Sequence, residues 1–134
     1  MLDNQKIQLI FKKFSQNYPN LQSELKSKNS FTFLISVILS AQSTDKSVNN
    51  ATKELFAIIK NPNDMIKLGE KKLKKYIKTI GLYNLKAKNI IALSYKLISD
   101  FDSQIPTSFK DLTSLPGVGN KTASVFQNVI LRLP

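Results

Sequence analysis

LTSLPGVGNKTASVF, residues 112–126, is the most informative stretch of this sequence. At its centre, Leu-Pro-Gly-Val-Gly (115–119) separates two helical segments. Pro116 stops the first, and two glycines around one apolar residue permit a sharp turn with positive φ. The turn opens onto the N-terminus of the next helix, where free N–H groups and the positive end of the helix dipole attract an anion. The stretch therefore predicts an anion-binding hairpin between two helices.

Two interpretations of this hairpin are open. It is either a plain αα-hairpin with a glycine turn and no ligand, or a helix-hairpin-helix motif that holds a phosphate of a DNA strand without reading its sequence. A short Gly-x-Gly would not separate the two. The whole pattern Leu-Pro-Gly-Val-Gly-x-Lys-Thr-Ala, after a short helix, favours the DNA motif, which we place at residues 108–131.

Lys121 falls in the first turn of the helix that follows the hairpin. The helix dipole and the surrounding lysines favour its neutral amine, which is the nucleophilic form. A lysine amine forms a Schiff base with an aldehyde carbon. Beside bound DNA, that carbon is C1′ of a deoxyribose that is losing, or has lost, its base. The alternative for any one of 19 lysines is a solvated charge, but the position of Lys121 beside the expected phosphate grip favours catalysis.

Helical periodicity extends from this motif over nearly the whole chain. Residues 31–41 are apolar on almost every side, which predicts a central, buried helix. Their β-branched side chains would also suit a strand, but no other segment could pair with it. The expected fold class is therefore all-α: a compact multi-helix bundle that contains the helix-hairpin-helix motif and no β-sheet. About eight helices are expected, over residues 4–17, 31–41, 45–59, 64–68, 70–80, 84–100, 108–114 and 120–131.

Capping residues mark several ends of these helices. Gly81 is the expected C′ residue after the 70–80 helix. The expected N-caps are Ser30, then Ser43 or Thr44, and Thr107 or Ser108.

The chain has 134 residues, enough for one domain with a hydrophobic core, and contains no Cys, His or Trp. Without Cys there is no disulfide, thiolate nucleophile, iron–sulfur cluster or Cys-based zinc site, and without His no Ser–His–Asp triad. We expect no metal site. The N-terminus has no secretory pattern, and no apolar run approaches the ~20 residues that span a bilayer. The expected location is the cytoplasm, with no membrane partner.

The charge is large and unevenly distributed, with 20 Lys and Arg against 9 Asp and Glu, a net charge of +11. One interpretation is biased codon use, because 19 of these 20 basic residues are Lys and both Asn and Ile are abundant. The other is a basic face for a polyanion, most simply nucleic acid. Residues 71–99 carry eight Lys and no acid, and residues 112–134 again carry no acid.

The sequence resembles the N-terminal portion of the endonuclease III family, bifunctional DNA glycosylase/AP lyases of the helix-hairpin-helix superfamily. Together the matching segments are highly specific, whereas the hairpin alone would indicate only the superfamily. They are LISVILSAQSTDKSVN (34–49), YIKTIGLYN (76–84), KAKNII (86–91) and LPGVGNKTA (115–123).

The resemblance implies base excision repair: removal of oxidised pyrimidines, then β-elimination at the abasic site through Lys121. Gln42 takes the position of the residue that fills the gap left by an extruded nucleotide, and Leu82 that of the wedge in the opposite strand. Without the resemblance, Gln42 is the polar end of a helix and Leu82 a core leucine after a glycine cap. The residues expected to bind DNA are Gln42, Leu82, Gly117, Val118, Gly119 and Thr122.

The sequence departs from the family pattern in three ways. The resemblance implies a catalytic aspartate in a Val-Asp-Thr-His motif after the last helix, and four cysteines that hold a [4Fe–4S] cluster; neither occurs in this sequence. No cofactor is therefore expected in this chain. Asn120 also stands where the family often has a basic residue. We expect residues 1–134 to be an incomplete helical glycosylase domain whose C-terminal part is missing.

The expected partner is double-stranded DNA with a damaged base or an abasic site, bound at the nucleoid, with the chain's own activity impaired. The alternative is a non-catalytic helix-hairpin-helix DNA-binding fragment or subunit. We expect a monomer that can self-associate through the exposed apolar face of the first helix.

Overall fold

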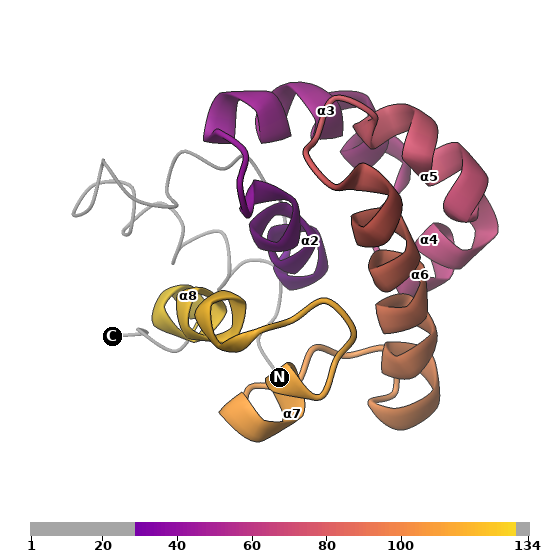
Figure 1. Cartoon of the computed structure of the whole chain (residues 1–134). Coiled ribbons are helices and arrows are strands. Elements are labelled where there is room, and N and C mark those ends of the chain that lie inside the picture. The colour runs from indigo at the N-terminus through magenta and orange to yellow at the C-terminus, as the bar shows by residue number, and fades with distance from the viewer. Residues whose placement is uncertain (1–28, 131–134) are drawn as a thin grey trace.

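The computed structural model describes residues 29–130, which form seven helices and no strand (Figure 1). The all-α prediction is confirmed for this part of the chain. The expected helix at 4–17 and the last residue of the 120–131 helix lie outside the described residues. The helices are α2 (Ser30–Ser40), α3 (Asp45–Ile58), α4 (Pro62–Leu68), α5 (Glu70–Ile77), α6 (Tyr83–Asp100), α7 (Phe109–Thr113) and α8 (Asn120–Ile130).

α2 is the buried helix at the centre of the molecule (Figure 1). Residues 31–39 are all buried, as predicted for a helix that is apolar on every side. Its N-cap is Asn29, so the prediction of Ser30 is wrong. The Asn29 side chain accepts the Thr32 N–H (2.9 Å) and the Thr32 hydroxyl accepts the Asn29 N–H (3.2 Å), a reciprocal capping box that Ser30 does not form.

α3 and α4 begin at capping side chains. Thr44 caps α3 by accepting the Ser47 N–H at 3.1 Å, which settles the choice between Ser43 and Thr44. α4 begins at Pro62, two residues before its predicted start at 64. The Asn61 side chain caps α4, and proline suits the first position of a helix because it has no N–H to satisfy.

The end of α5 differs from the prediction. α5 ends at Ile77, and Gly81 lies beyond its C-cap, Lys78, so Gly81 is not the C′ residue. The left-handed conformation falls one residue later, on Leu82 (φ 59°), which is the N-cap of α6. Gly81 instead lies against the segment after α2, since a Cβ placed there would be 3.7 Å from the carbonyl oxygen of Gln42.

The hairpin helices pack onto the same central element. Ser108, not Thr107, caps α7 by accepting the Asp111 N–H at 3.1 Å. α8 packs against both α7 and α2, and the rings of Phe33 and Phe126 lie 6.0 Å apart between α2 and α8. α3 and α6 also pack on α2, while α4 and α5 cover α6. The hairpin and the 42–44 segment are thus both attached to α2.

None of the described helices combines the length and the apolar character that crossing a membrane requires.

Candidate functional site

The hairpin is a tight, glycine-dependent turn between α7 and α8. Gly117 has φ +81°, a conformation that side chains with a Cβ rarely adopt. The Val118 N–H donates to the Leu115 carbonyl at 3.1 Å, and the Val118 side chain is buried. Gly117 and Gly119 are exposed. Val118 therefore anchors the turn in the core, and the two glycines present backbone to solvent.

α6 supports the hairpin from inside the molecule. A Cβ on Gly117 would lie 2.9 Å from the Cβ of Asn89, so the turn approaches α6 as closely as glycine allows. The Lys96 ammonium donates to the Ser114 carbonyl at 3.1 Å, next to the end of α7. Gln127 of α8 donates to the Thr107 carbonyl at 2.9 Å, just before α7. The sequence analysis did not identify these three supporting side chains.

Lys121 lies in the first turn of α8 with its side chain exposed. Within residues 29–130, no hydrogen bond or ion pair engages its ammonium. Thr122 is half-buried beside it, and the first turn of α8 is closed by the Ala123 N–H donating to the Gly119 carbonyl at 3.0 Å. An unpaired amine thus lies at a helix N-terminus, directly after the exposed turn, as predicted.

Gln42 and Leu82 lie on neighbouring connections. Gln42 follows α2 and Leu82 precedes α6, and the 3.7 Å approach of Gly81 to the Gln42 carbonyl oxygen joins the two segments. Both residues have left-handed backbone, with φ of 63° and 59°, and both are exposed. The Leu82 side chain is 58% exposed, so its alternative interpretation as a core leucine is wrong.

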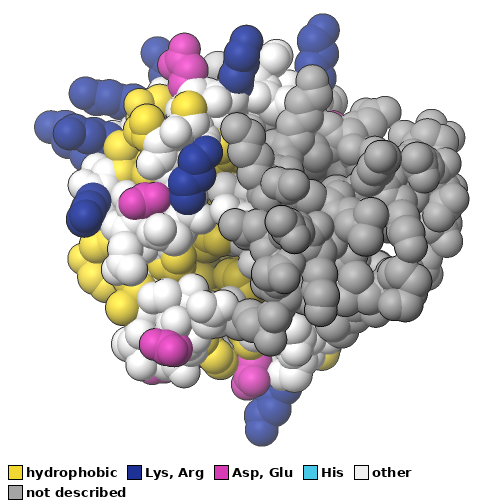
Figure 2. Space-filling view, turned by 180° about the vertical axis from the view of Figure 1, so that it is seen from behind, with side chains coloured by type: hydrophobic (Ala, Val, Ile, Leu, Met, Phe, Trp, Pro, Cys, Tyr) yellow, Lys and Arg dark blue, Asp and Glu magenta, His cyan; other side chains and the backbone are white. Residues whose placement is uncertain are grey.

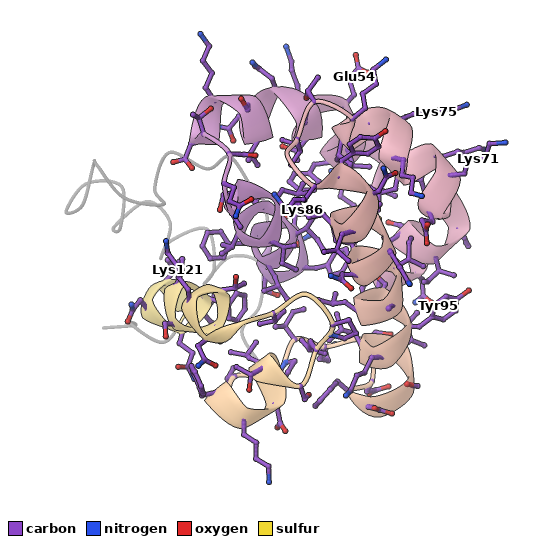
Figure 3. All side chains as sticks on the ribbon, viewed as in Figure 1. Glu54, Lys71, Lys75, Lys86, Tyr95 and Lys121 are labelled. Atoms are coloured by element: carbon purple, nitrogen blue, oxygen red, sulfur yellow. The ribbon has the colours of Figure 1, made fainter. Side chains whose placement is uncertain are left out.

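Lys86 is a buried lysine between these two connections (Figure 3). Its ammonium donates to the Ala41 carbonyl at 2.6 Å and to the Leu39 carbonyl at 3.2 Å, at the C-terminal end of α2. Burial lowers the pKa of this amine, because the charged form is poorly solvated there. Its place in the basic segment 71–99 predicts an exposed lysine instead. Helical spacing could have predicted its burial. Lys86 lies four residues before Ile90 and therefore on the same face of α6 as the buried Ile90, Leu93 and Leu97.

Within residues 29–130, the lysines of α5 and of the hairpin lie on different sides (Figure 3). Lys71 and Lys75 of α5 project from one side of the molecule and Lys121 lies on the other (Figure 3). From behind, lysine side chains again follow the outer edge that α5 forms (Figure 2). Within α5, Lys74 pairs with Glu70 at 3.1 Å. Helix packing therefore separates the lysines of α5 from the hairpin (Figure 3).

Metal and cluster ligands are scarce in this chain. Within residues 29–130, no three His, Cys, Asp or Glu side chains gather as a metal site would require. The sequence has no Cys, so its residues do not fit an iron–sulfur cluster, which is held by thiolates.

Comparison with known proteins gives a consistent result. The sequence profile of the "HhH-GPD superfamily base excision DNA repair protein" matches residues 35–128. Endonuclease III of Rickettsia conorii is 57% identical over 125 residues, covering 93% of this chain and 60% of that protein. Endonuclease III of Treponema pallidum is 47% identical over all 134 residues, which cover 64% of its length. The chain thus spans about three fifths of the length of these relatives.

A solved structure shares the fold. It is a trapped endonuclease III–DNA covalent intermediate, an estranged-adenine complex, which superposes with a TM-score of 0.81 at 40% identity. The match covers 100% of this chain and 63% of the other.

Proposed function

The chain belongs to the HhH-GPD superfamily of base excision DNA repair proteins, and from this premise we propose that it acts on DNA as a glycosylase and abasic-site lyase of the endonuclease III type. The observation that carries the proposal is the exposed amine of Lys121 in the first turn of α8, directly after the glycine hairpin and without a partner among residues 29–130. A relative captured as a covalent intermediate with DNA supports it.

In the proposed reaction the Lys121 amine attacks C1′ of the damaged nucleoside. The bond to the base breaks as the bond to nitrogen forms, and the base leaves with a proton. Opening of the sugar ring gives the Schiff base, which also forms from an existing abasic aldehyde with loss of one water. Loss of a 2′ proton then breaks the C3′–O bond, so the 3′ phosphate leaves. Water hydrolyses the remaining imine and releases the amine.

The hairpin supplies the grip on DNA in this proposal. The exposed backbone of Gly117 and Gly119 meets a phosphate oxygen, with the N-terminus of α8 behind it and Val118 fixing the turn in the core. Thr122 adds its hydroxyl to this contact. Grip of this kind is independent of sequence, which suits an enzyme that searches a genome for rare lesions.

Gln42 and Leu82 take the place of the extruded nucleotide. Extruding a base costs a few kcal/mol of stacking and pairing, so the vacated space must be refilled. The exposed Leu82 side chain fills the stack, and the Gln42 amide hydrogen-bonds the orphaned base. The proximity of their two connections supports this pairing. We propose oxidised pyrimidines in double-stranded DNA as the substrate class, acted on at the nucleoid in the cytoplasm.

Borohydride trapping tests the proposal. Reduction converts the transient imine on abasic-site DNA into a stable adduct that migrates slowly on a denaturing gel. We expect the wild type and Lys75→Gln, an exposed lysine on the far side, to give equal adduct, and Lys121→Gln to give none. Equal trapping by Lys121→Gln contradicts the assignment. DNA binding without any adduct from the wild type would identify a non-catalytic DNA-binding module instead.

A further inference from the structure

Lys86 lies at the junction of the two connections that carry Gln42 and Leu82. It belongs to the first turn of α6, and its side chain crosses to the end of α2, where it is only 7% exposed. Two carbonyls, of Leu39 and Ala41, accept its ammonium protons at 3.2 and 2.6 Å. These bonds satisfy groups that a helix end leaves without partners, and they place a positive charge at the negative end of the α2 dipole.

The bond to Ala41 bears directly on Gln42. The Ala41 carbonyl and the Gln42 nitrogen belong to one planar peptide group, so holding the carbonyl also orients the N–Cα bond about which φ of Gln42 turns. That φ is 63°, a left-handed value that a residue with a Cβ adopts only when its surroundings impose it. The Ser43 N–H, which donates to Ser40 at 3.1 Å, closes the same turn.

The backbone of Lys86 is also bonded to Leu82, through a main-chain hydrogen bond of α6. Its N–H donates to the Leu82 carbonyl at 2.9 Å, which closes the first turn of α6 on a residue whose own φ is 59°. One residue thus bonds to both connections, through its amide on one side and its ammonium on the other.

We propose that Lys86 is a positioning residue that sets the spacing between Gln42 and Leu82, so that both enter the gap left by an extruded nucleotide together. The inference rests on the proposed function for the roles of those two side chains. Lys86 does not touch DNA, because its ammonium is buried and both contacts are to backbone carbonyls.

The first test measures selectivity for a gap in DNA. The affinity ratio between a duplex with a tetrahydrofuran abasic-site analogue and the undamaged duplex is compared for Lys86→Met and Lys88→Met. Both remove one lysine charge from α6, but Lys88 is exposed. We expect Lys86→Met to lower the ratio by about tenfold, as for the loss of one charge-assisted hydrogen bond, and Lys88→Met to leave it unchanged. Lys86→Arg keeps the charge and the hydrogen-bond donors, so its affinity ratio should be close to that of the wild type.

A double-mutant comparison separates positioning from general support of the fold. In a Gln42→Ala, Leu82→Ala background there is nothing left to position, so Lys86→Met should not lower selectivity further. A further tenfold loss in that background would overturn the inference. If Lys86→Met does not fold, Lys86→Gln takes its place, since the shorter amide does not reach the Ala41 carbonyl.

A second measurement needs no DNA. Amide hydrogen exchange at Ser43, in the turn after α2, should be faster in Lys86→Met than in Lys88→Met, because the Ala41 peptide is no longer held. Unchanged exchange overturns the inference. A wild type with no preference for the abasic analogue would contradict the proposed function, and the exchange result would still decide whether Lys86 holds this turn.

Discussion

Four residues of the described chain other than glycine have left-handed backbone, and they fall into two groups. Asp102 and Ser103 follow α6, where the Ser103 N–H donates back to Leu97 at 2.8 Å and ends the helix. Gln42 and Leu82 instead lie in the two connections joined by Lys86. Each left-handed residue costs roughly 1–2 kcal/mol, and at Gln42 the bond from the Lys86 ammonium to the Ala41 carbonyl holds the peptide that precedes it.

Gly117→Ala tests the hairpin at a single residue. The alanine would have to adopt a left-handed φ, and its Cβ would lie 2.9 Å from the Cβ of Asn89. We therefore expect the free energy of unfolding to fall by about 1–3 kcal/mol. Thermal or urea denaturation measures it. Gly119→Ala is the matched control, because φ there is not left-handed and its Cβ would meet open space. Equal destabilisation by both changes would show that the turn conformation is not the cause.

Lys86 also predicts a pH dependence of stability. The folded state binds the Lys86 proton less tightly than the unfolded chain, whose lysines have a pKa of about 10.4. At a pH below the pKa of Lys86 in the folded protein, the amine is charged in both states, and the full free-energy cost of burying the charge opposes folding. As pH rises through that pKa, the unfolded state holds more protons, so the free energy of unfolding increases. The free energy of unfolding of the wild type should therefore increase relative to that of Lys86→Met as the pH becomes alkaline. A shift in the opposite direction would contradict it.

Four of the described helices, α2, α3, α4 and α7, begin at a side chain that caps their first turn. Asn29, Thr44, Asn61 and Ser108 each accept an N–H in the first turn of the helix they precede. α4 and α7 have only seven and five residues, so they depend on such caps and on burial of Met65 and Leu112. These caps set where α2, α3, α4 and α7 begin, whereas α5 and α6 begin without a side-chain cap.

Asn29→Ala should lower the free energy of unfolding by about 1 kcal/mol through the lost α2 cap. The Asn29 amide also donates to the Lys60 carbonyl at 3.0 Å, beyond the end of α3. Asn29→Asp keeps the cap acceptor and removes that donor, so it should retain most of the stability. Chemical denaturation of both variants gives the comparison. An Asp variant as unstable as the Ala variant would assign the effect to the Lys60 bond.

At the scale of the whole molecule, α2 is the element on which the proposed functional parts converge. α8 with Lys121 packs on it, α6 with Lys86 packs beside it, and Gln42 follows it directly. The lysines of α5 lie on another side (Figure 3). DNA held at the hairpin would therefore leave the α5 lysines outside the contact.

This arrangement predicts how DNA affinity depends on salt. The slope of log affinity against log salt concentration reports the number of phosphate charges neutralised. Lys121→Gln should reduce that slope by up to about one, whereas Lys75→Gln should leave it unchanged, although each removes one charge. Binding to undamaged duplex between low and moderate salt measures both. An equal reduction by Lys75→Gln would place α5 in the DNA contact.

Several features were predictable because they depend on neighbours in sequence. The burial of α2 and the glycine turn at 117 follow from periodicity and local conformational preference. The same preferences narrow the caps of α3 and α7 to two candidates each, of which the structure selects Thr44 and Ser108. The sequence predicts the cap of α2 one residue late, because Asn29 and Ser30 are both good caps and only the bonds with Thr32 distinguish them. Gly81 was assigned a helix end by its residue type, but α5 ends before it reaches Gly81.

The sequence by itself determined the helical fold, the hairpin and the position of Lys121 at a helix N-terminus, because each depends on residues a few positions apart. Tertiary structure alone decided the partners of Lys86, which is 45 residues from Ala41, and the separation of the α5 lysines from the hairpin. Charge and hydropathy patterns do not show which residues far apart in the sequence lie close together in the fold. The same lysine is solvated on one face of a helix and buried on another, according to which helix packs against it.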